Sequence, residues 1–255
     1  MVKIAAVIPA RMASSRFPGK PLLKVRGLPM IEHVRRRALL CGRFTEVAVA
    51  TCDEEIAQAV RQAGGRVIMT SPAHPAATDR VAEAARRLDC THVMNIQGDE
   101  ILVLPEDLDR MISAMQARPE VEYWNAVARI EERAELGNRS IVKCVVSRSE
   151  RILHCGRDFS SLGNLGKEFD PIRKVLGILG FRKEALNKYI GLARTPLETV
   201  ESVDQSRVLE HDLALQGVLF QRGYIGINQP DEVDQVLECL SRDPSQRTVL
   251  QALAV

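Results

Sequence analysis

The sequence has few features that would suit a membrane protein, a disulfide-rich secreted protein or a nucleic-acid-binding surface. Its apolar runs all fall short of the roughly 20 residues that span a bilayer. Its 35 basic and 33 acidic residues leave a net charge of only +2, too small to attract an anionic polymer across the whole surface. The six cysteines include no Cys-x-x-Cys pair and no spacing typical of a zinc site. We therefore expect a cytoplasmic protein with reduced thiols that binds neither nucleic acid nor membrane.

Two common phosphate-binding motifs are also missing, Gly-x-x-x-x-Gly-Lys-Ser/Thr and Gly-x-Gly-x-x-Gly. Instead, the apolar run from Ile4 to Ile8 leads into a loop that carries Arg11, Arg16 and Lys20, with Gly19 between them. Cations and free backbone N–H groups on one short loop can converge on an oligophosphate. The loop therefore predicts an anion site, and a solvated basic surface is the alternative.

Apolar and amphipathic segments alternate through the first half of the chain. Strands are expected at 3–9, 46–51, 66–69, 91–95 and 123–130, and helices at 30–41, 53–63, 78–88 and 105–118. This order predicts right-handed βαβ units and an α/β fold with a doubly wound, mainly parallel, Rossmann-like sheet. We expect Asp53 to cap the second helix, and Arg35 to Arg37 to form the solvent-exposed face of the first.

Ligands of such sheets bind beyond the carboxyl ends of the strands. Three loops follow predicted strand ends, at 10–20, 70–77 and 97–100, so we expect them to meet at one edge. The second half is less regular. There we expect a hairpin at 140–147 and 151–155, a mobile loop at 160–166, a strand at 175–182, one helix over 196–215 and a final helix at 233–241.

Several motifs occur along the chain in a characteristic order. They are Pro-Ala-Arg-x-x-Ser-x-Arg-x-Pro-Gly-Lys-Pro-Leu at 9–22, Gly-x-Pro-Met-Ile-x-His-Val at 27–34, Met-Thr-Ser-Pro-x-His-Pro at 69–75 and Gln-Gly-Asp-Glu at 97–100. They continue as Val-Lys-x-Val-Val at 142–146, Gly-Ile-x-Gly-Phe-Arg at 177–182, Pro-Leu-Glu-x-x-Glu at 196–201 and Gln-x-Arg-Val-Leu-Glu at 205–210. The set resembles the 3-deoxy-manno-octulosonate (Kdo) cytidylyltransferases, the CMP-Kdo synthetases, over nearly the whole chain.

The resemblance implies Mg²⁺-dependent transfer of CMP from CTP to the hydroxyl of a 2-keto sugar acid similar to Kdo, or of a related small acid, with release of pyrophosphate, in surface-glycan or lipopolysaccharide synthesis. Phosphoryl transfer depends mainly on positioned cationic side chains and a metal ion, and the basic loop could supply the cationic side chains. The resemblance gives catalytic roles to Arg11, Lys20 and Asp99, and metal-binding roles to Asp99 and Asn228. The nucleotide-binding residues that it implies are Ala10, Arg11, Arg16, Lys20, Ser71, Thr78, Arg80 and Gln97.

Each of these roles has a structural alternative. Asp99 could cap a turn or helix, and Gln97 could be a turn residue. Thr78 could cap a helix, and Arg80 could form a surface ion pair with Asp79 or Glu83.

On the acceptor side, Arg157 resembles a clamp for the sugar carboxylate, and a surface arginine is the alternative. Glu198, Glu201 and Gln205 are spaced to share one helix face, which would contact substrate or solvent. The other acceptor-side residues that we expect are Gln97, Val175 and Leu179.

Two departures from the family pattern bear on the metal and on the acceptor. Asn228 stands where the family has an aspartate, so we expect weaker Mg²⁺ affinity, because an amide oxygen can bind the ion without adding charge. Val175-Leu-Gly-Ile-Leu179 replaces His-x-Gly-x-Tyr, which removes two hydrogen-bonding side chains from the acceptor side. We therefore expect an acceptor other than ordinary Kdo.

The resemblance also implies one nucleotidyltransferase domain over 1–255. Its expected parts are a nucleotide-binding part at 1–130, a smaller β-rich part for substrate binding and dimerisation at 131–190, and return helices at 191–255. A homodimer would form around 140–190, where the apolar residues available for burial are Leu153, Leu162, Leu165, Ile172 and Leu176. Two alternatives stay open: a nucleotidyltransferase for a sugar 1-phosphate, and a non-catalytic CTP-binding protein.

Overall fold

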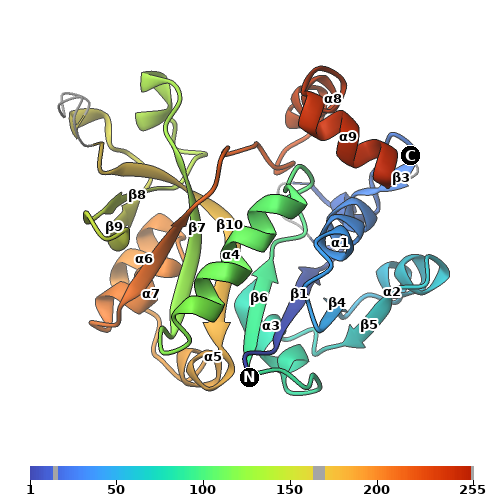
Figure 1. Cartoon of the computed structure of the whole chain (residues 1–255), viewed down its shortest axis with the longest axis horizontal. Coiled ribbons are helices and arrows are strands. Elements are labelled where there is room, and N and C mark those ends of the chain that lie inside the picture. Colours follow the sequence, from blue (N-terminus) through green and yellow to red (C-terminus); the bar gives the residue numbers. More distant parts are fainter. Residues whose placement is uncertain (14–16, 163–169, 254–255) are drawn as a thin grey trace. The chain divides into compact units, whose positions relative to one another are not determined.

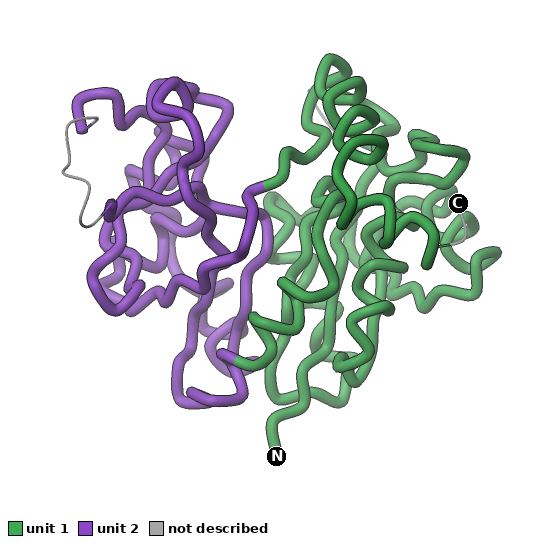
Figure 2. Tube along the Cα trace, turned by 45° about the horizontal axis from the view of Figure 1, so that its top comes forward, with its two compact units in different colours: residues 1–113, 224–255 green, residues 114–223 purple. Residues whose placement is uncertain are grey.

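A computed structural model describes residues 1–13, 17–162 and 170–253. The chain forms two compact units, one of residues 1–113 with 224–255 and one of residues 114–223 (Figure 2). The sequence predicted a functional division at 1–130, 131–190 and 191–255, and the roles of these three parts stay a prediction. Within the described ranges, no helix combines the length and the apolarity needed to cross a bilayer.

The first unit contains a parallel sheet. Its strands pair in the order β5 (Arg66–Met69), β4 (Glu46–Thr51), β1 (Ile4–Ala10) and β6 (His92–Ile96) (Figure 1). The chain runs outward from β1 through β4 to β5 and then returns to β6, on the other side of β1. Because parallel crossovers are right-handed, this reversal creates a switch point between β1 and β6. The loops that follow these two strands therefore begin side by side.

The helices of this unit are α1 (Met30–Leu40), α2 (Glu54–Gln62), α3 (Ala77–Ala85), most of α4 (Pro105–Ala117), α8 (Glu232–Arg242) and α9 (Pro244–Ala252). A 3₁₀ turn, η1 (Lys20–Leu22), and a short hairpin of β2 (Lys24–Val25) and β3 (Leu28–Pro29) precede α1. Every residue of β1 is buried, as expected for a central parallel strand covered on both faces.

The second unit is mixed rather than parallel. Its strands are β7 (Tyr123–Arg129), β8 (Lys143–Val146), β9 (Arg151–Gly156), β10 (Ile172–Arg182) and β11 (Leu215–Leu219). They pair in the ring β10–β7–β11–β9–β8, and β8 pairs with β10 again to close it; of these pairs, only β7–β11 is parallel. The helices are α5 (Lys183–Tyr189), α6 (Pro196–Glu201) and α7 (Gln205–Glu210), with 3₁₀ turns η2 (Arg133–Leu136) and η3 (Ser160–Leu162). The α/β class is confirmed, and the fold as a whole contains a mixed sheet.

Most predicted elements are present, and β4 and β5 have the predicted bounds. The single helix predicted over 196–215 is wrong. Ser202 adopts a left-handed conformation with φ 53°, which ends α6, and α7 starts at Gln205. The segment then continues as strand β11, so 191–255 is not purely helical. The loop predicted at 160–166 lies partly outside the described residues.

The prediction that Arg35 to Arg37 form the solvent-exposed face of the first helix is also wrong, because Arg35 and Arg37 are buried. Arg35 donates to both carboxylate oxygens of Glu32, at 2.6 and 2.7 Å. Arg37 donates to the carbonyl of Val103 at 3.0 Å. The Glu32 carboxylate compensates the buried Arg35 charge, whereas Arg37 has a neutral carbonyl as its acceptor, and its Nε and Nη2 atoms have no hydrogen-bond partner among the described residues. Helix α1 is therefore enclosed over most of its circumference.

Candidate active site

The basic loop after β1 is fastened at its beginning and near its end. The N–H of Met12 donates to the carboxylate of Asp53 at 2.8 Å. The N–H of Gly19 donates to the carbonyl of Met12 at 3.0 Å, and Gly19 has φ +76°, a conformation that favours glycine. These contacts deliver Lys20 to the start of η1. Arg16, predicted to bind nucleotide, lies outside the described residues.

Asp53 does not act as predicted. It occupies the residue before α2, but its side chain makes no capping bond to that helix. Its carboxylate serves the basic loop instead, from the end of the neighbouring strand β4. Sequence reasoning missed this role because Met12 and Asp53 are 41 positions apart.

Lys20 and Asp99 form an ion pair at the switch point. The Lys20 Nζ atom lies 3.0 Å from the Asp99 Oδ2 atom, and the two side chains are 12% and 27% exposed. Asp99 follows β6 in the turn that Gln97 begins, and the Gln97 amide donates to the Asn95 side chain at 3.4 Å. A Cβ on Gly98 would lie 3.0 Å from the carbonyl oxygen of Pro9, so glycine permits the two loops to approach closely.

A distant segment brings Asn228 to the same place. The N–H of Ile227 donates to the carbonyl of Asp99 at 3.3 Å. A Cβ on Gly226 would lie 2.7 Å from that carbonyl oxygen, so a larger residue could not make this approach unchanged. The N–H groups of Asn228 and Gln229 both donate to Glu232, near the start of α8. Asn228 is thus held in the segment that contacts Asp99.

The three predicted loops meet around a pocket of about 240 Å³. It is lined by Pro9, Ala10, Arg11, Lys20, Pro21, Met30, His74, Ala76, Ala77, Arg80, Gln97, Gly98 and Asp99. Five predicted nucleotide-site residues are in this set: Ala10, Arg11, Lys20, Arg80 and Gln97. Ser71 and Thr78 are not. Thr78 is buried, and the Ser71 hydroxyl accepts from the N–H of Ala73 in its own turn.

Arg80 is a buried pocket residue and forms neither of the predicted surface ion pairs. Its guanidinium donates to the Thr70 hydroxyl and, at 3.5 Å, to the Cys52 sulfur. The predicted partner Glu83 pairs with His74 instead. Hydrogen bonds from the Ser71 backbone and from His74 lower the pKa of the Glu83 carboxyl. His74 was not assigned a role from the sequence, although its motif at 69–75 could have indicated one.

In the second unit, Arg157 is tied to the main chain. It donates to the carbonyls of Glu201 at 2.6 Å and Arg139 at 2.8 Å, and its own N–H donates to the Glu201 carboxylate at 3.1 Å. Neither a free carboxylate clamp nor a loose surface arginine describes this geometry. Val175 is half-buried and Leu179 is buried, and β10 is irregular between them where it pairs with β7.

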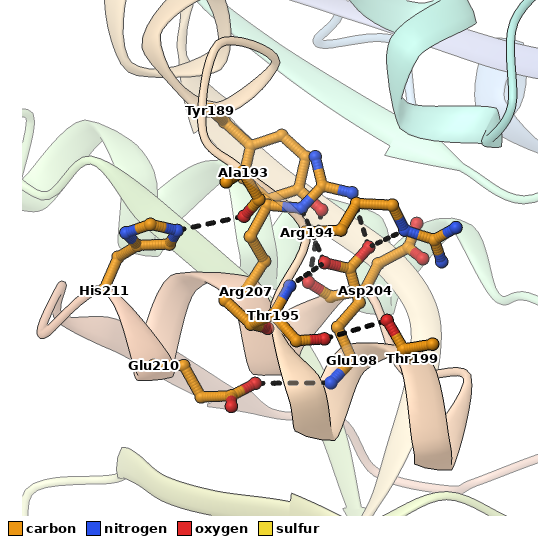
Figure 3. Close-up of polar contacts among 10 residues, drawn as sticks. All are labelled: Tyr189, Ala193, Arg194, Thr195, Glu198, Thr199, Asp204, Arg207, Glu210 and His211. Atoms are coloured by element: carbon orange, nitrogen blue, oxygen red, sulfur yellow. Dashed lines mark hydrogen bonds and ion pairs between the residues drawn. The ribbon is translucent and has the colours of Figure 1, made fainter.

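Glu198 is fully buried, so the prediction of a substrate-facing or solvent-facing position is wrong. It accepts from Arg207 Nε at 2.8 Å and from Arg194 Nε at 3.1 Å (Figure 3). Burial raises the pKa of the Glu198 carboxyl, but hydrogen bonding and charge from Arg207 outweigh it, so the pKa is lowered. Arg207 in turn lies over the ring of Tyr189, at 4.5 Å from its centroid.

Gln205 does not share a helix face with Glu198 or Glu201, because helix α6 ends at Glu201 and a separate helix, α7, begins at Gln205. Its amide donates to the Asn125 side chain on β7 at 2.7 Å.

The residues expected at the dimer interface differ in their exposure to solvent. Leu153 and Leu162 are 52% and 38% exposed, whereas Ile172 and Leu176 are already buried within their own unit. Leu165 lies outside the described residues.

A parallel sheet whose switch point carries a basic loop, a lysine and a carboxylate is typical of a nucleotidyltransferase. Residues 5–215 match the family model described as "Cytidylyltransferase". The chain belongs to the cytidylyltransferase family and is an enzyme of the nucleotidyltransferase class.

Individual relatives agree with this assignment. The chain is 38% identical over 253 residues to a 3-deoxy-manno-octulosonate cytidylyltransferase of Geobacter metallireducens, covering 94% of this chain and 99% of that protein. It is 38% identical over 243 residues to one of Myxococcus xanthus, covering 94% and 97%. A solved structure of CMP:2-keto-3-deoxy-manno-octonic acid synthetase complexed with CTP matches with a TM-score of 0.86 and 32% identity, covering 94% of this chain and 99% of that one. The resemblance predicted from the motifs is confirmed.

Proposed function

We propose that this protein transfers CMP from CTP to the hydroxyl of a 2-keto sugar acid similar to 3-deoxy-manno-octulosonate, in a Mg²⁺-dependent reaction that releases pyrophosphate. The observation that carries this proposal is the pairing of Lys20 with Asp99 at 3.0 Å, at the switch point of a parallel sheet. A cation for phosphate and a carboxylate for metal are the two groups that phosphoryl transfer needs most. The names of the relatives support the choice of CTP and of an acidic sugar.

The pocket residues divide by their chemistry. Arg11 and Lys20, together with Arg16, hold the triphosphate, because their loop begins at the carboxyl end of β1. Ala10, Gln97 and Arg80 surround the rest of the nucleotide, and buried Arg80 offers a fixed donor for it. Ser71 and Thr78 shape the neighbouring turn. The geometry favours stabilisation of charge over covalent chemistry by the protein.

The oxygen atoms that Asp99 and Asn228 offer fit a magnesium ion. The Asp99 carboxylate lines the pocket, and the segment of Asn228 is hydrogen-bonded to the Asp99 carbonyl. Mg²⁺ prefers oxygen ligands, and needs only one or two from the protein when phosphates and water supply the others. Asp99 and Asn228 would hold the ion, which, when bound, neutralises negative charge on the phosphates.

The acceptor would contact Gln97, Val175, Leu179 and Gln205. Arg157, Glu198 and Glu201 would act by maintaining the shape of their unit, given the internal contacts that they make. The proposal also includes a homodimer and a cytoplasmic location. Free cysteines, such as the facing pair Cys144 and Cys155 on β8 and β9, suit a reducing compartment.

Pyrophosphate release, measured for four nucleoside triphosphates against a panel of acceptors, tests the proposal. The panel should contain Kdo, other 2-keto sugar acids and sugar 1-phosphates. We expect turnover only with CTP, with Mg²⁺ and with a sugar acid, and we expect Kdo not to be the best acceptor. Turnover with a sugar 1-phosphate in preference to every free acid would contradict the acceptor class. CTP binding without turnover on any acceptor would favour a non-catalytic protein.

A further inference from the structure

Lys20 and Asp99 neutralise each other across the pocket at 3.0 Å, and each is the group that one of the proposed ligands would use. Their main chains are both fixed. The carbonyl of Lys20 accepts from Leu23 N at 3.0 Å, and the carbonyl of Asp99 accepts from Ile101 N at 2.8 Å and from Ile227 N at 3.3 Å. The two side chains are therefore free to exchange partners without movement of the loops that carry them.

A ligand that arrives alone meets an obstacle in this pair. A divalent cation that takes the Asp99 carboxylate must displace the ammonium of Lys20, which is only 12% exposed and would stay beside the metal as a like charge. A triphosphate that takes Lys20 leaves the Asp99 carboxylate unpaired beside phosphate oxygens. Leaving one partner of a shielded ion pair without its counter-charge is costly.

The two ligands together remove both obstacles. The metal replaces the ammonium at Asp99, and the phosphates replace the carboxylate at Lys20, so no charge remains uncompensated. We propose that the Lys20–Asp99 pair makes metal and nucleotide binding mutually dependent, so that the pocket selects the metal–triphosphate complex over either component. This inference rests on the proposed function. Because such coupling is reciprocal, each ligand should tighten the other by the same factor, on the order of 10-fold.

Binding measurements on the full chain can test this coupling without activity. Calorimetry should follow CTP in EDTA, CTP with Mg²⁺, and Mn²⁺ alone, with Mn²⁺ as a spectroscopically visible substitute for Mg²⁺. Lys20→Met frees the carboxylate, so we expect it to bind Mn²⁺ alone several-fold more tightly than the wild type. Asp99→Asn frees the ammonium, so we expect it to bind CTP in EDTA several-fold more tightly. Both variants should lose the tightening of one ligand by the other.

Lys24→Met is the matched control, because Lys24 is exposed on β2 and does not line the pocket. It should leave all three affinities unchanged. Lys20→Arg keeps the charge pair and should keep the coupling. If Lys20→Met does not fold, Asp99→Asn decides the question alone, because the shape of its side chain is nearly unchanged.

The outcomes separate this inference from the proposed function. Wild-type protein that binds Mg²⁺–CTP, with neither variant gaining affinity for its single ligand, would overturn the coupling and leave the proposed function intact. Wild-type protein that binds no CTP under any condition would overturn the proposed function itself.

Discussion

At the scale of single residues, Asp53 controls the basic loop from outside the pocket, through the hydrogen bond that it accepts from Met12 N at 2.8 Å. We expect Asp53→Ala to lower kcat/KM by roughly 10- to 100-fold, mainly through a higher KM for CTP, because a hydrogen bond to a charged group contributes about 1.5–3 kcal/mol. Asp53→Asn keeps an acceptor oxygen and should recover much of the loss.

Steady-state kinetics with varied CTP would measure this effect. Glu54→Ala is a suitable control, because the adjacent Glu54 is exposed at the start of α2 and pairs with Arg61 rather than with the loop. Equal KM values in the Asp53→Ala and Glu54→Ala variants would show that Asp53 does not position the loop.

The sequence could place Arg11, Lys20 and Asp99 at one edge of the sheet because each stands in a local motif after a predicted strand. It could not reveal the role of Asp53 or the close approach of Gly226, because both depend on contacts between positions far apart in the chain. The structural alternative for Arg80, a surface ion pair with Asp79 or Glu83, is wrong for the same reason. Its partners Thr70 and Cys52 are not its helical neighbours, so a pattern of spacing within the helix favoured Glu83 instead.

At the scale of elements, helix α1 contains a buried histidine that should make stability depend on pH. His33 is fully buried, and its Nε2 atom bonds to the Val25 carbonyl at 2.8 Å. Burial lowers the pKa of His33 from 6.5 to about 4, although the backbone hydrogen bond opposes the shift. The unfolded chain therefore binds more protons than the folded chain between these values. The contribution of neutral His33 to the free energy of unfolding is complete above pH 6.5. It declines as pH falls toward 4, by up to about 1.4 kcal/mol per pH unit.

Urea denaturation at pH 7, 5.5 and 4.8 would measure this decline in the free energy of unfolding. Carboxyls with a lowered pKa, such as that of Glu198, begin to lose their stabilising contribution near pH 5, as pH falls toward the ordinary value of 4.5, so the interval from pH 7 to 5.5 reports most directly on the histidine. His33→Gln removes the titrating group and keeps an N–H donor, so its stability should change less with pH. Parallel pH profiles of the two proteins would contradict the assignment.

The joint between α6 and α7 depends on Glu198, which pairs with Arg207 in the interior (Figure 3). We expect Glu198→Gln to lower the free energy of unfolding by about 3–5 kcal/mol, because it leaves the Arg207 charge buried without a counter-charge. The control Glu184→Gln breaks an exposed pair with Arg182 at 3.6 Å and should cost less than about 1 kcal/mol. Similar urea midpoints for the two variants would show that the Glu198 pair is not structural.

This joint also explains why one predicted helix was wrong. Pro196 and the spacing of Glu198 and Glu201 favour a continuous helix, and no glycine or proline marks the break at Ser202. The break is stabilised by tertiary contacts, because the Ser202 and Glu201 carbonyls accept from Arg157. Helices and strands of the first unit were easier to predict, since βαβ units alternate locally and their strands are mostly apolar.

At the scale of the whole molecule, the proposed homodimer makes a prediction about mass. Leu153 on β9 and Leu162 on η3 are exposed apolar residues in the segment where the dimer is expected. Light scattering should give twice the mass of one 28.3-kDa chain. Leu153→Asp should shift the protein to monomer, because burying a leucine contributes about 1.5–3 kcal/mol, and a two-fold interface buries two of them. Val200→Asp is the control, since Val200 is 76% exposed on α6 and lies outside this segment. The Val200→Asp variant should remain a dimer. A monomeric wild type at micromolar concentration, or equal dissociation of both variants, would contradict an interface at Leu153.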